Sequence, residues 1–332
     1  MKITPTWIAD FETNLSTIIL GTYENAVQRL HWDRLMTVKQ SQAGRELIMW
    51  LLETANLYDR GNGGNTRIDE LAGTYFEILN RDIGAGLVLT KNEIQDNQLN
   101  RPGLPQGMSP LDLAGQWARS MAALAAYHPQ SVLYKLIAAG ESAKGYDGVS
   151  FFNTAHPVNG IDGTHGYFPN VFTGAKYDLI ADVGQANYGK AAQALNDSIA
   201  EIGALKLPNG MPRLLKPTTL LVPPAKRLVA KQLTAATTIN ATDNMSMNLG
   251  LEPIVADELV GAPDDWYIGC EVIGDNQVGP FVFQDRQPFE LTSFSPMDQV
   301  QLNAKKEYLW DFDGRNAGSY GHPYLFFKFK KA

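Results

Sequence analysis

The side chains best suited to catalysis or metal binding are five histidines and one cysteine. His156 and His165 lie on either side of Asp162, and three such side chains could together hold a metal ion. Their segment is rich in glycine and asparagine, residues that more often form turns. No histidine pair has the His-x-x-x-His or His-Glu-x-x-His spacing of a helical zinc site. The sequence therefore favours a turn here and predicts no metal site.

No clear nucleophile accompanies these histidines. Cys270 follows an apolar run, where a lone thiol is typically a small core residue, and a single cysteine excludes a disulfide within the chain. The Gly-x-Ser-x-Gly motif of the α/β-hydrolases is absent. Residues 59–65 have the glycine content of a phosphate loop but lack its Lys-Ser/Thr pair. We expect no catalytic residue and no cofactor; an α/β hydrolase using His156 with an acid is the weakest alternative.

The composition describes a folded chain that carries little charge. Of its 332 residues, 44% are hydrophobic and 19% are charged, below the roughly 25% charged residues of a typical domain. The net charge is −7, whereas a dedicated nucleic-acid binder usually has a basic excess. No signal peptide begins the chain, and no stretch approaches the ~20 apolar residues of a membrane span. We expect synthesis in the cytoplasm and a surface partly covered by something other than charge.

The elements that must position these residues begin with helical and strand patterns in the N-terminal third. Residues 8–35 predict short helical pieces, either an arm packed on another surface or an ordinary pair of helices. Apolar runs at 46–52 and 73–90 flank the asparagine- and glycine-rich segment and predict a long β-hairpin. Because an isolated two-stranded hairpin is only marginally stable, this hairpin implies a partner surface.

The strongest local signal predicts a helix over residues 109–140. Ser109 and Asp112 have the spacing of a helix N-cap, Pro110 suits the first turn, and Gly140 is a natural stop. Pro129 predicts a kink or break within it.

Strands and helices alternate further along the chain. After a turn at 147–148, the pair Phe151-Phe152 predicts a short buried strand. Residues 185–290 contain a helical pattern followed by several strand patterns, which predicts an α/β subdomain. The remaining tail is strongly β.

Four strings, in this order, resemble the major head subunit of Mu-like phages and prophages. The most specific is YDGVSFFNTAHP at 146–157, similar to the family segment Tyr-Asp-Gly-x-x-Phe-Phe-x-Thr-x-His-Pro. The others are TKNEIQDN at 90–97, KPTTLLVPP at 216–224 and DGRN at 313–316. Together they cover most of residues 45–332, whereas the segment before residue 45 is assigned by position only.

The resemblance implies an α+β chain with the Hong Kong 97 capsid fold. It implies an axial domain that meets its copies at the capsomer centre and a peripheral domain that carries a long spine helix. The segments would be an N-terminal arm at 1–45, an extended β-hairpin loop at 46–90, a peripheral domain at 91–184 with its spine helix at 109–140, an axial domain at 185–290, and a return to the peripheral domain at 291–332.

The function implied is structural rather than enzymatic. A major capsid protein of this family self-assembles as hexamers and pentamers into the icosahedral head of a tailed phage, around packaged double-stranded DNA. The chain would be assembled in the host cytoplasm and found in the virion. An encapsulin-like compartment shell, which shares the fold, is the first alternative.

The resemblance also implies partners and contact residues. Besides other copies of itself, we expect a separate scaffolding protein, a portal, decoration proteins and DNA held without sequence-specific binding, and no membrane. The predicted inter-subunit contacts lie on the hairpin, although a purely local role is equally open for its aromatic residues. These candidates are Arg60, Asn62, Arg67, Asp69, Trp50, Tyr75 and Phe76.

Overall fold

The computed structural model describes most of the chain. The described residues are 3–43, 45–51, 73–97, 109–160, 163–180, 185–236, 238–239, 242–244, 246, 249–272, 278–293 and 306–331. They form a mixed helix and sheet structure, which confirms the expected α+β class.

Five α-helices are present in these residues, together with short 3-10 turns. The helices are α1 Pro5–Val27, α2 Lys91–Asp96, α3 Pro110–Ala139, α4 Gln185–Gly203 and α5 Arg227–Thr234. The strands are β1 Met36–Gln40, β2 Arg45–Leu51, β3 Gly73–Leu79, β4 Arg81–Thr90, β5 His156–Pro157, β6 Tyr167–Phe168, β7 Val171–Thr173, β8 Leu215–Val222, β9 Thr238–Ile239, β10 Thr242–Asp243, β11 Glu252–Val255, β12 Asp265–Val272, β13 Phe281–Ser293, β14 Glu307–Tyr320 and β15 Phe326–Lys330.

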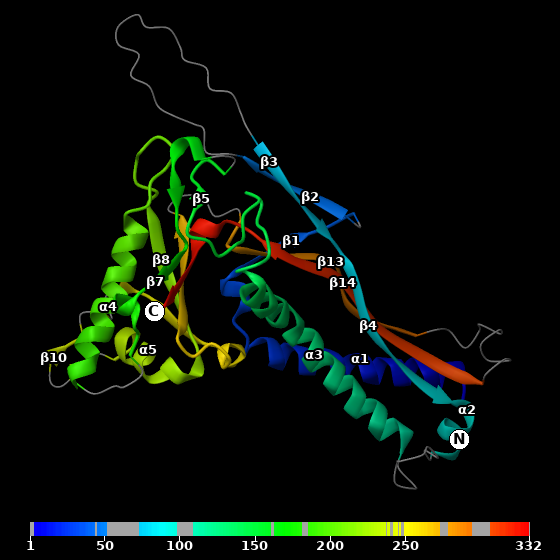
Figure 1. Cartoon of the computed structure of the whole chain (residues 1–332). Coiled ribbons are helices and arrows are strands. Elements are labelled where there is room, and N and C mark those ends of the chain that lie inside the picture. The colour runs from blue at the N-terminus through cyan, green and yellow to red at the C-terminus, as the bar shows by residue number, and fades with distance from the viewer. Residues whose placement is uncertain are drawn as a thin grey trace, which may run out of the picture.

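One half of the molecule is a five-stranded sheet in the order β11-β8-β12-β15-β7, flanked by α4 and α5 (Figure 1). Its central strands are apolar on both faces, as is typical of a covered sheet. Residues from α4, α5 and the sheet share one core that includes Leu195, Leu233, Trp266 and Phe329. The helical and strand patterns between 185 and 272 are therefore confirmed.

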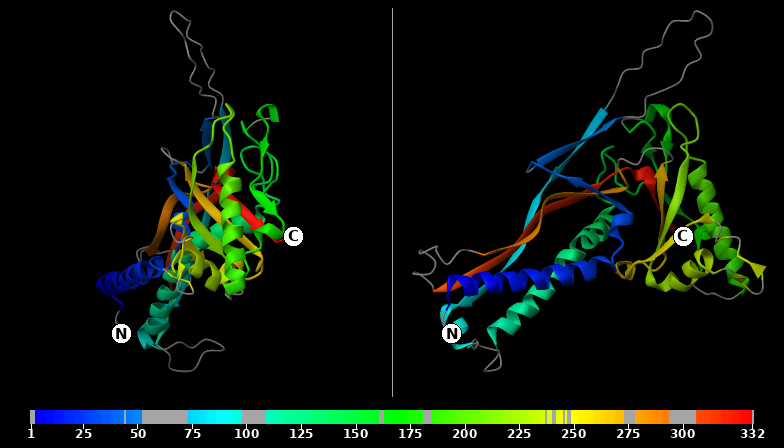
Figure 2. Two further views of the ribbon diagram at one scale, coloured as in Figure 1. Left: turned by 90° about the vertical axis from the view of Figure 1, so that its left-hand side faces the viewer. Right: turned by 180° about the vertical axis from the view of Figure 1, so that it is seen from behind.

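The other half is an elongated four-stranded sheet in the order β1-β13-β14-β4. Seen from behind, α1 and α3 run on the same side of this sheet (Figure 2). Their shared core contains Phe11 and Leu15 of α1, Ala118 of α3 and Trp310 of β14. The small residues of α3 allow the two helices to approach closely. This half of the molecule is therefore stabilised by α1 packing against α3 and the sheet of the same chain.

Aromatic residues join the two halves. Phe151 stacks on Tyr320 of β14 at 4.7 Å between ring centroids, and Phe152 lies 5.8 Å from Tyr267 of β12. Phe281 of β13 is 5.1 Å from Phe326 of β15. The two sheets thus share a continuous aromatic core.

The N-terminal segment differs from the short helical pieces that its weak periodicity predicted. Residues 5–27 form one uninterrupted helix, capped by Thr4, whose Oγ1 accepts the Trp7 N–H at 3.1 Å. The apolar residues Ile8, Phe11 and Leu15 recur at helical spacing and are buried together. Tertiary packing of this face, rather than local propensity, extends the helix.

The predicted break at Pro129 is wrong, because α3 runs continuously from Pro110 to Ala139. Both flanks of Pro129 are buried, with Ala126 before it and Leu133 after it. This packing offsets the roughly 3 kcal/mol that an interior proline costs a helix. The predicted helix and its end at Gly140 are otherwise confirmed.

The predicted side-chain cap at Ser109 is not formed. Its hydroxyl is instead hydrogen bonded to Asn97 Oδ1 at 3.1 Å. A complete capping box occurs in the TKNEIQDN string: the carboxylate of Glu93 accepts the Thr90 N–H at 2.8 Å, and Thr90 Oγ1 accepts the Glu93 N–H. The short helix α2 is fixed by these reciprocal bonds.

The predicted strand at Phe151-Phe152 is also wrong. Both residues lie in bends, and their N–H groups donate to Ala143 and Gly140 at 2.9 and 2.8 Å. Their rings are buried between the two sheets, so the apolar pattern reported burial correctly but not backbone conformation.

The sheets do not coincide with the segment ranges expected from the sequence. β13 starts inside the range 185–290 yet pairs with β1 and β14, and β15 in the tail pairs with β12 of the five-stranded sheet. Alternating apolar residues fit either sheet equally well, so pairing partners rather than pattern decide these boundaries.

Candidate functional site

A two-stranded hairpin of β2 and β3 leaves the body of the molecule and carries Trp50, Tyr75 and Phe76 of the predicted contact residues (Figure 1). β2 and β3 pair antiparallel, with Met49 opposite Tyr75 and Ile48 opposite Phe76. This pairing confirms the base of the predicted hairpin. Among the described residues β2 and β3 pair only with each other, so their outer edges remain available.

The individual contact candidates are placed to different extents. Phe76 is half-buried in β3. Trp50 and Tyr75 belong to β2 and β3, and the structure describes their backbone pairing only. Arg60, Asn62, Arg67 and Asp69 lie outside the described residues. The predicted second strand, 73–90, is interrupted at Asn80: β3 before it pairs with β2, and β4 after it pairs with β14.

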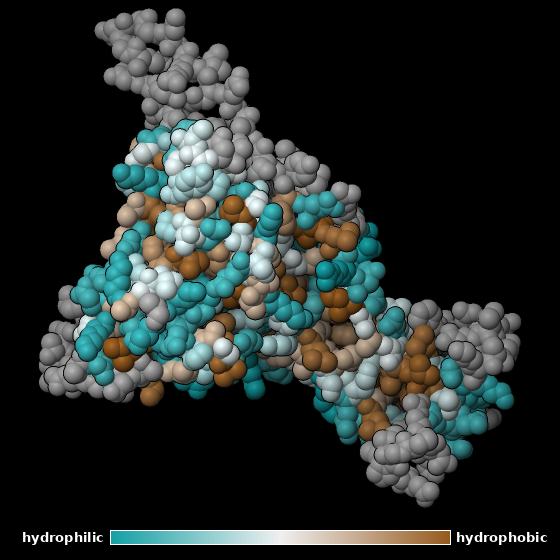
Figure 3. Space-filling view, in the orientation of Figure 1, coloured by the Kyte–Doolittle hydropathy of each residue, from teal (hydrophilic) through white to brown (hydrophobic). Residues whose placement is uncertain are grey.

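An apolar groove of about 340 Å³ lies between α3 and the four-stranded sheet. It is lined by Ile83, Met121, Leu124, Phe289 and Phe312. Leu124 is 58% exposed in the isolated chain. Figure 3 shows apolar residues gathered on the half of the molecule that contains α3 and the four-stranded sheet. The sequence pattern of α3 did not single out this groove, because β4, β13 and β14 supply five of its eleven lining residues.

The only histidine inside the YDGVSFFNTAHP string is fully buried beside a carboxylate. His156 Nδ1 lies 2.5 Å from Asp147 Oδ2, and the two side chains are 0% and 2% exposed. His156 Nε2 lies 3.1 Å from the Phe151 carbonyl oxygen and 3.3 Å from Asn170 Oδ1. Through these contacts the imidazole links Asp147, Phe151 and Asn170, which belong to three segments of the chain.

Asn170 completes this network from the neighbouring strand region. Its side-chain amide donates to the carbonyl oxygens of Phe151 at 2.6 Å and Pro323 at 3.3 Å, and Oδ1 accepts the Asn153 N–H at 2.9 Å. Every one of these partners is internal. The imidazole ring of His156 also stacks on the ring of Phe168, with 5.2 Å between the ring centroids. A group so enclosed cannot reach a substrate, so His156 is structural, and the hydrolase alternative loses its base.

A second histidine, His322, is half-buried beside this network. His322 stacks on Tyr324 at 4.6 Å, and the guanidinium of Arg213 lies 4.1 Å from the same tyrosine ring. Burial, aided by the charge of Arg213, lowers the pKa of His322 to about 3. The imidazole is therefore neutral at physiological pH.

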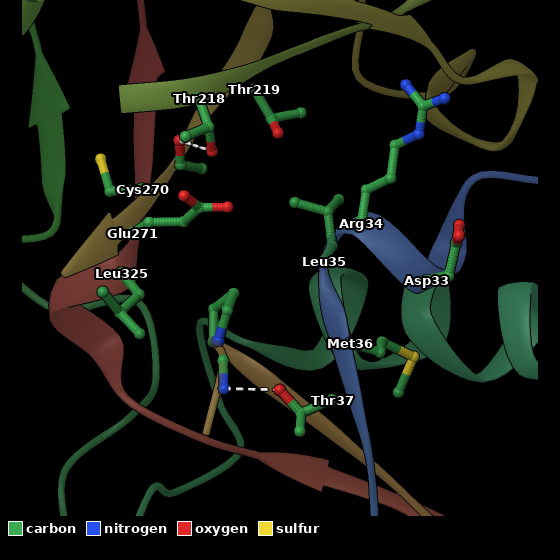
Figure 4. Close-up of a pocket in the computed structure, with 13 residues that line it drawn as sticks. Asp33, Arg34, Leu35, Met36, Thr37, Thr218, Thr219, Cys270, Glu271 and Leu325 are labelled. Atoms are coloured by element: carbon green, nitrogen blue, oxygen red, sulfur yellow. Dashed lines mark hydrogen bonds between the residues drawn. The ribbon is translucent and has the colours of Figure 1, made fainter. Parts of the chain in front are cut away.

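Cys270 lies in a small cavity between the two sheets (Figure 4). The cavity is about 130 Å³ and is closed on one side by the Gly279 N–H, which donates to Thr37 Oγ1 at 2.7 Å. Ligand pockets are usually about 300–1,000 Å³, so this space is too small for a cofactor. Burial raises the pKa of the Cys270 thiol, which keeps it protonated.

No group of three or more potential ligands among His, Cys, Asp and Glu converges on a metal position in the described part of the chain. Within the same residues, no helix has both the length and the apolar character needed to cross a membrane.

Solved structures with a similar fold are shells. The capsid protein of cyanophage P-SCSP1u has a TM-score of 0.53 at 10% identity, covering 90% of this chain and 86% of its own. The virus-like particle of Pyrococcus furiosus gives 0.50 at 9% identity, covering 95% and 98%. The bacteriophage JBD30 capsid gives 0.47 at 14% identity; 90% of this chain is covered, but only 64% of the JBD30 chain. No curated protein sequence matches significantly.

The first two likenesses show that the chain has the Hong Kong 97 fold. The family model for the Mu-like prophage major head subunit gpT matches residues 11–179, and a phage capsid protein model matches residues 111–310. The chain belongs to the family of Mu-like prophage major head subunits. The expected resemblance is confirmed.

Proposed function

We propose that this chain is the structural subunit of a phage or prophage head and works by assembly rather than catalysis. Copies associate as hexamers and pentamers into an icosahedral shell that encloses double-stranded DNA. The carrying observation is the β2–β3 hairpin, which extends from the body and pairs with no other described strand. A two-stranded element of this kind needs a second surface to be stable.

The apolar surface supports the same proposal. Leu124, which is 58% exposed, lies together with Met121, Phe289 and Phe312 in the apolar groove between α3 and the four-stranded sheet. Contiguous exposed apolar surface on a folded chain usually marks a contact with another protein. In a shell these positions are covered by neighbouring copies, and many weak contacts add up to a stable particle.

The hairpin is proposed as the extended loop, and its residues as contacts to a neighbouring copy. Replacing Arg60 and Arg67 together by alanine should reduce the yield of shells while leaving the melting temperature of the unassembled subunit unchanged. Arg227→Ala, on the exposed face of α5, serves as the matched control. Normal shells from the double variant would remove these residues from the interface.

Negative-stain microscopy and light scattering of the purified chain test the main proposal. The chain should be expressed alone and together with a scaffolding protein from the same source, since we propose that scaffolding, portal and decoration proteins are separate chains. Closed megadalton shells are expected. A chain that remains monomeric or dimeric under both conditions would contradict the proposal.

The similarity to a virus-like particle keeps an encapsulin-like compartment as the second candidate, because that chain is matched over almost its full length. The contents of particles isolated from their natural source distinguish the two functions. Nuclease-protected DNA of genome length supports a head, whereas an enclosed enzyme and no DNA would support a compartment.

A further inference from the structure

The two strands of the hairpin connect to the edge strands of the four-stranded sheet, β1 and β4, at the same level of that sheet. β1 ends at Gln40 and β2 begins at Arg45, whereas β3 ends at Leu79 and β4 begins at Arg81. Asn80 therefore separates the hairpin from the body on one side, and residues 41–44 separate it on the other. Figure 1 shows β3 running on into β4, with only Asn80 between the two strands.

The side chain of Asn80 connects the two segments that link the hairpin to the sheet. Its Nδ2 donates to Ser41 Oγ at 3.0 Å and to the Ala43 carbonyl oxygen at 2.9 Å. Its Oδ1 accepts from Gln284 Nε2 of β13 at 2.9 Å. Ser41 is itself fixed to β13, because its N–H donates to the Asp285 carbonyl oxygen at 2.8 Å. One amide thus ties both ends of the hairpin to the body.

Ser41, Asn80 and Gln284 are polar, yet they occupy buried positions where apolar side chains would stabilise the fold equally well. Ser41 and Asn80 are each 6% exposed and Gln284 is 0% exposed. Gln284 Oε1 has no hydrogen-bond partner among the described residues. A buried polar atom without a partner costs stability. The hydrogen bonds that are made at Asn80 and Ser41 do, however, require a narrow range of distances and angles, so they restrict the direction of the hairpin.

We propose that Asn80 and Gln284 form a clamp that fixes the angle at which the β2–β3 hairpin leaves the subunit. The clamp acts by positioning: it holds the hairpin where a neighbouring copy can receive it. This inference rests on the proposed assembly function and deepens it by naming the residues that set the geometry of the contact.

Two variants test the clamp, Asn80→Ala and Gln284→Met. The matched controls are Asn25→Ala on α1 and Gln193→Met on α4, whose exposed amides bond only within their own helices. The first measurement is hydrogen exchange of the backbone amides of residues 45–51 and 73–79 in the unassembled subunit. Both clamp variants should exchange about tenfold faster there, as expected for the loss of a buried hydrogen bond, and the controls should match the wild type.

The second measurement is the size distribution of assembled particles by electron microscopy. The clamp variants should give fewer and less uniform shells. Gln284→Met should do so with a smaller fall in melting temperature than Asn80→Ala: it keeps the volume and removes the unpartnered Oε1, although it also leaves Asn80 Oδ1 without its donor. This variant decides the matter if Asn80→Ala does not fold.

Unchanged hairpin exchange in Gln284→Met, with uniform shells, would overturn the clamp. Failure of the wild-type chain to form shells would instead count against the assembly function, and the exchange measurement would still decide the clamp.

Discussion

His156 and Asp147 form a buried pair, with His156 Nδ1 2.5 Å from Asp147 Oδ2 and neither side chain more than 2% exposed. The pair closes the loop 147–156 on itself, and Asn170 and the Phe151 carbonyl oxygen complete its hydrogen bonds. The segment YDGVSFFNTAHP at 146–157 therefore forms a loop that is closed by buried hydrogen bonds next to the aromatic core. The His156–Asp147 pair stabilises the fold, and for this reason it is enclosed rather than open to a substrate.

Removing one partner of this pair should destabilise the subunit strongly. Asp147→Ala leaves His156 without its carboxylate and should lower the free energy of unfolding by about 3–5 kcal/mol. Asp147→Asn should cost less, because it keeps the shape of the side chain. Urea unfolding of the unassembled subunit measures both. Asp257→Asn, in an exposed pair with Arg227, is the control, and an equal loss in Asp147→Ala and the control would contradict a structural role for the pair.

The aromatic junction between the sheets should respond to truncation of Phe151. This ring is 1% exposed and stacks on Tyr320. Phe151→Ala should lower the free energy of unfolding by about 3–5 kcal/mol, because burial is lost and a cavity remains. Phe151→Leu should lose less. Calorimetry of the subunit checks the order, and two separate transitions in Phe151→Ala would show that the halves had uncoupled.

Two glycines should respond oppositely to substitution by alanine. A Cβ at Gly321 would overlap the backbone carbonyl oxygen of Gly279, whereas a Cβ at Gly189 of α4 meets no atom within 4 Å. Gly321→Ala should destabilise the subunit by about 1–3 kcal/mol through overpacking. Gly189→Ala should stabilise it by about 0.5–1 kcal/mol, as for a helix interior. Thermal unfolding measures both, and a destabilised Gly189→Ala would be inconsistent with this packing.

Stability should fall on mild acidification because of His322. Its pKa is about 3 in the folded chain, against about 6.5 when unfolded. Between these values only the unfolded chain binds the proton, so stability is complete above about pH 6.5 and decreases as the pH falls towards 3. Burial also lowers the pKa of His31 and His128, which adds to the same trend.

The measurement is urea unfolding at pH 7 and pH 5 for the wild type and His322→Gln. The wild type should lose about 1.4 kcal/mol per pH unit through this group. The free energy of unfolding of His322→Gln should fall by about 1.4 kcal/mol less per pH unit than that of the wild type. Identical pH dependence in the two proteins would rule out the contribution of His322.

The thiol of Cys270 should be unreactive in the folded subunit. It is buried, and that burial raises its pKa, so little thiolate is available to react. An aromatic disulfide reagent at pH 8 should label the native protein no faster than it unfolds and the urea-unfolded protein at once. Rapid labelling of the native chain would show that the cavity in Figure 4 opens to solvent.

Much of the fold could be predicted from local patterns. The helix at 110–139 was predicted at nearly its observed bounds, since apolar residues recur at helical spacing and Pro110 and Gly140 mark its ends. The base of the hairpin was predicted for a similar reason, because two apolar runs flank a turn-forming segment. Local patterns failed where packing overrides them, as at Pro129, which is buried in an unbroken helix.

The candidate sites were less predictable, because they depend on residues far apart in the chain. The clamp joins Ser41, Asn80 and Gln284, and no spacing rule relates such positions. The apolar groove combines α3 with strands on either side of it in sequence. Only the hairpin, a local feature, was identified in advance as a contact surface.

The sequence by itself determined the family, the α+β composition and the absence of a recognisable catalytic motif, since ordered strings and periodicity are properties of the chain alone. Tertiary structure decided which strands pair, where the hairpin leaves the body and that His156 meets Asp147 rather than a substrate. The physical reason is that strand alternation specifies which face is buried but not the partner. Burial of a polar group likewise depends on side chains that only folding brings within hydrogen-bond distance.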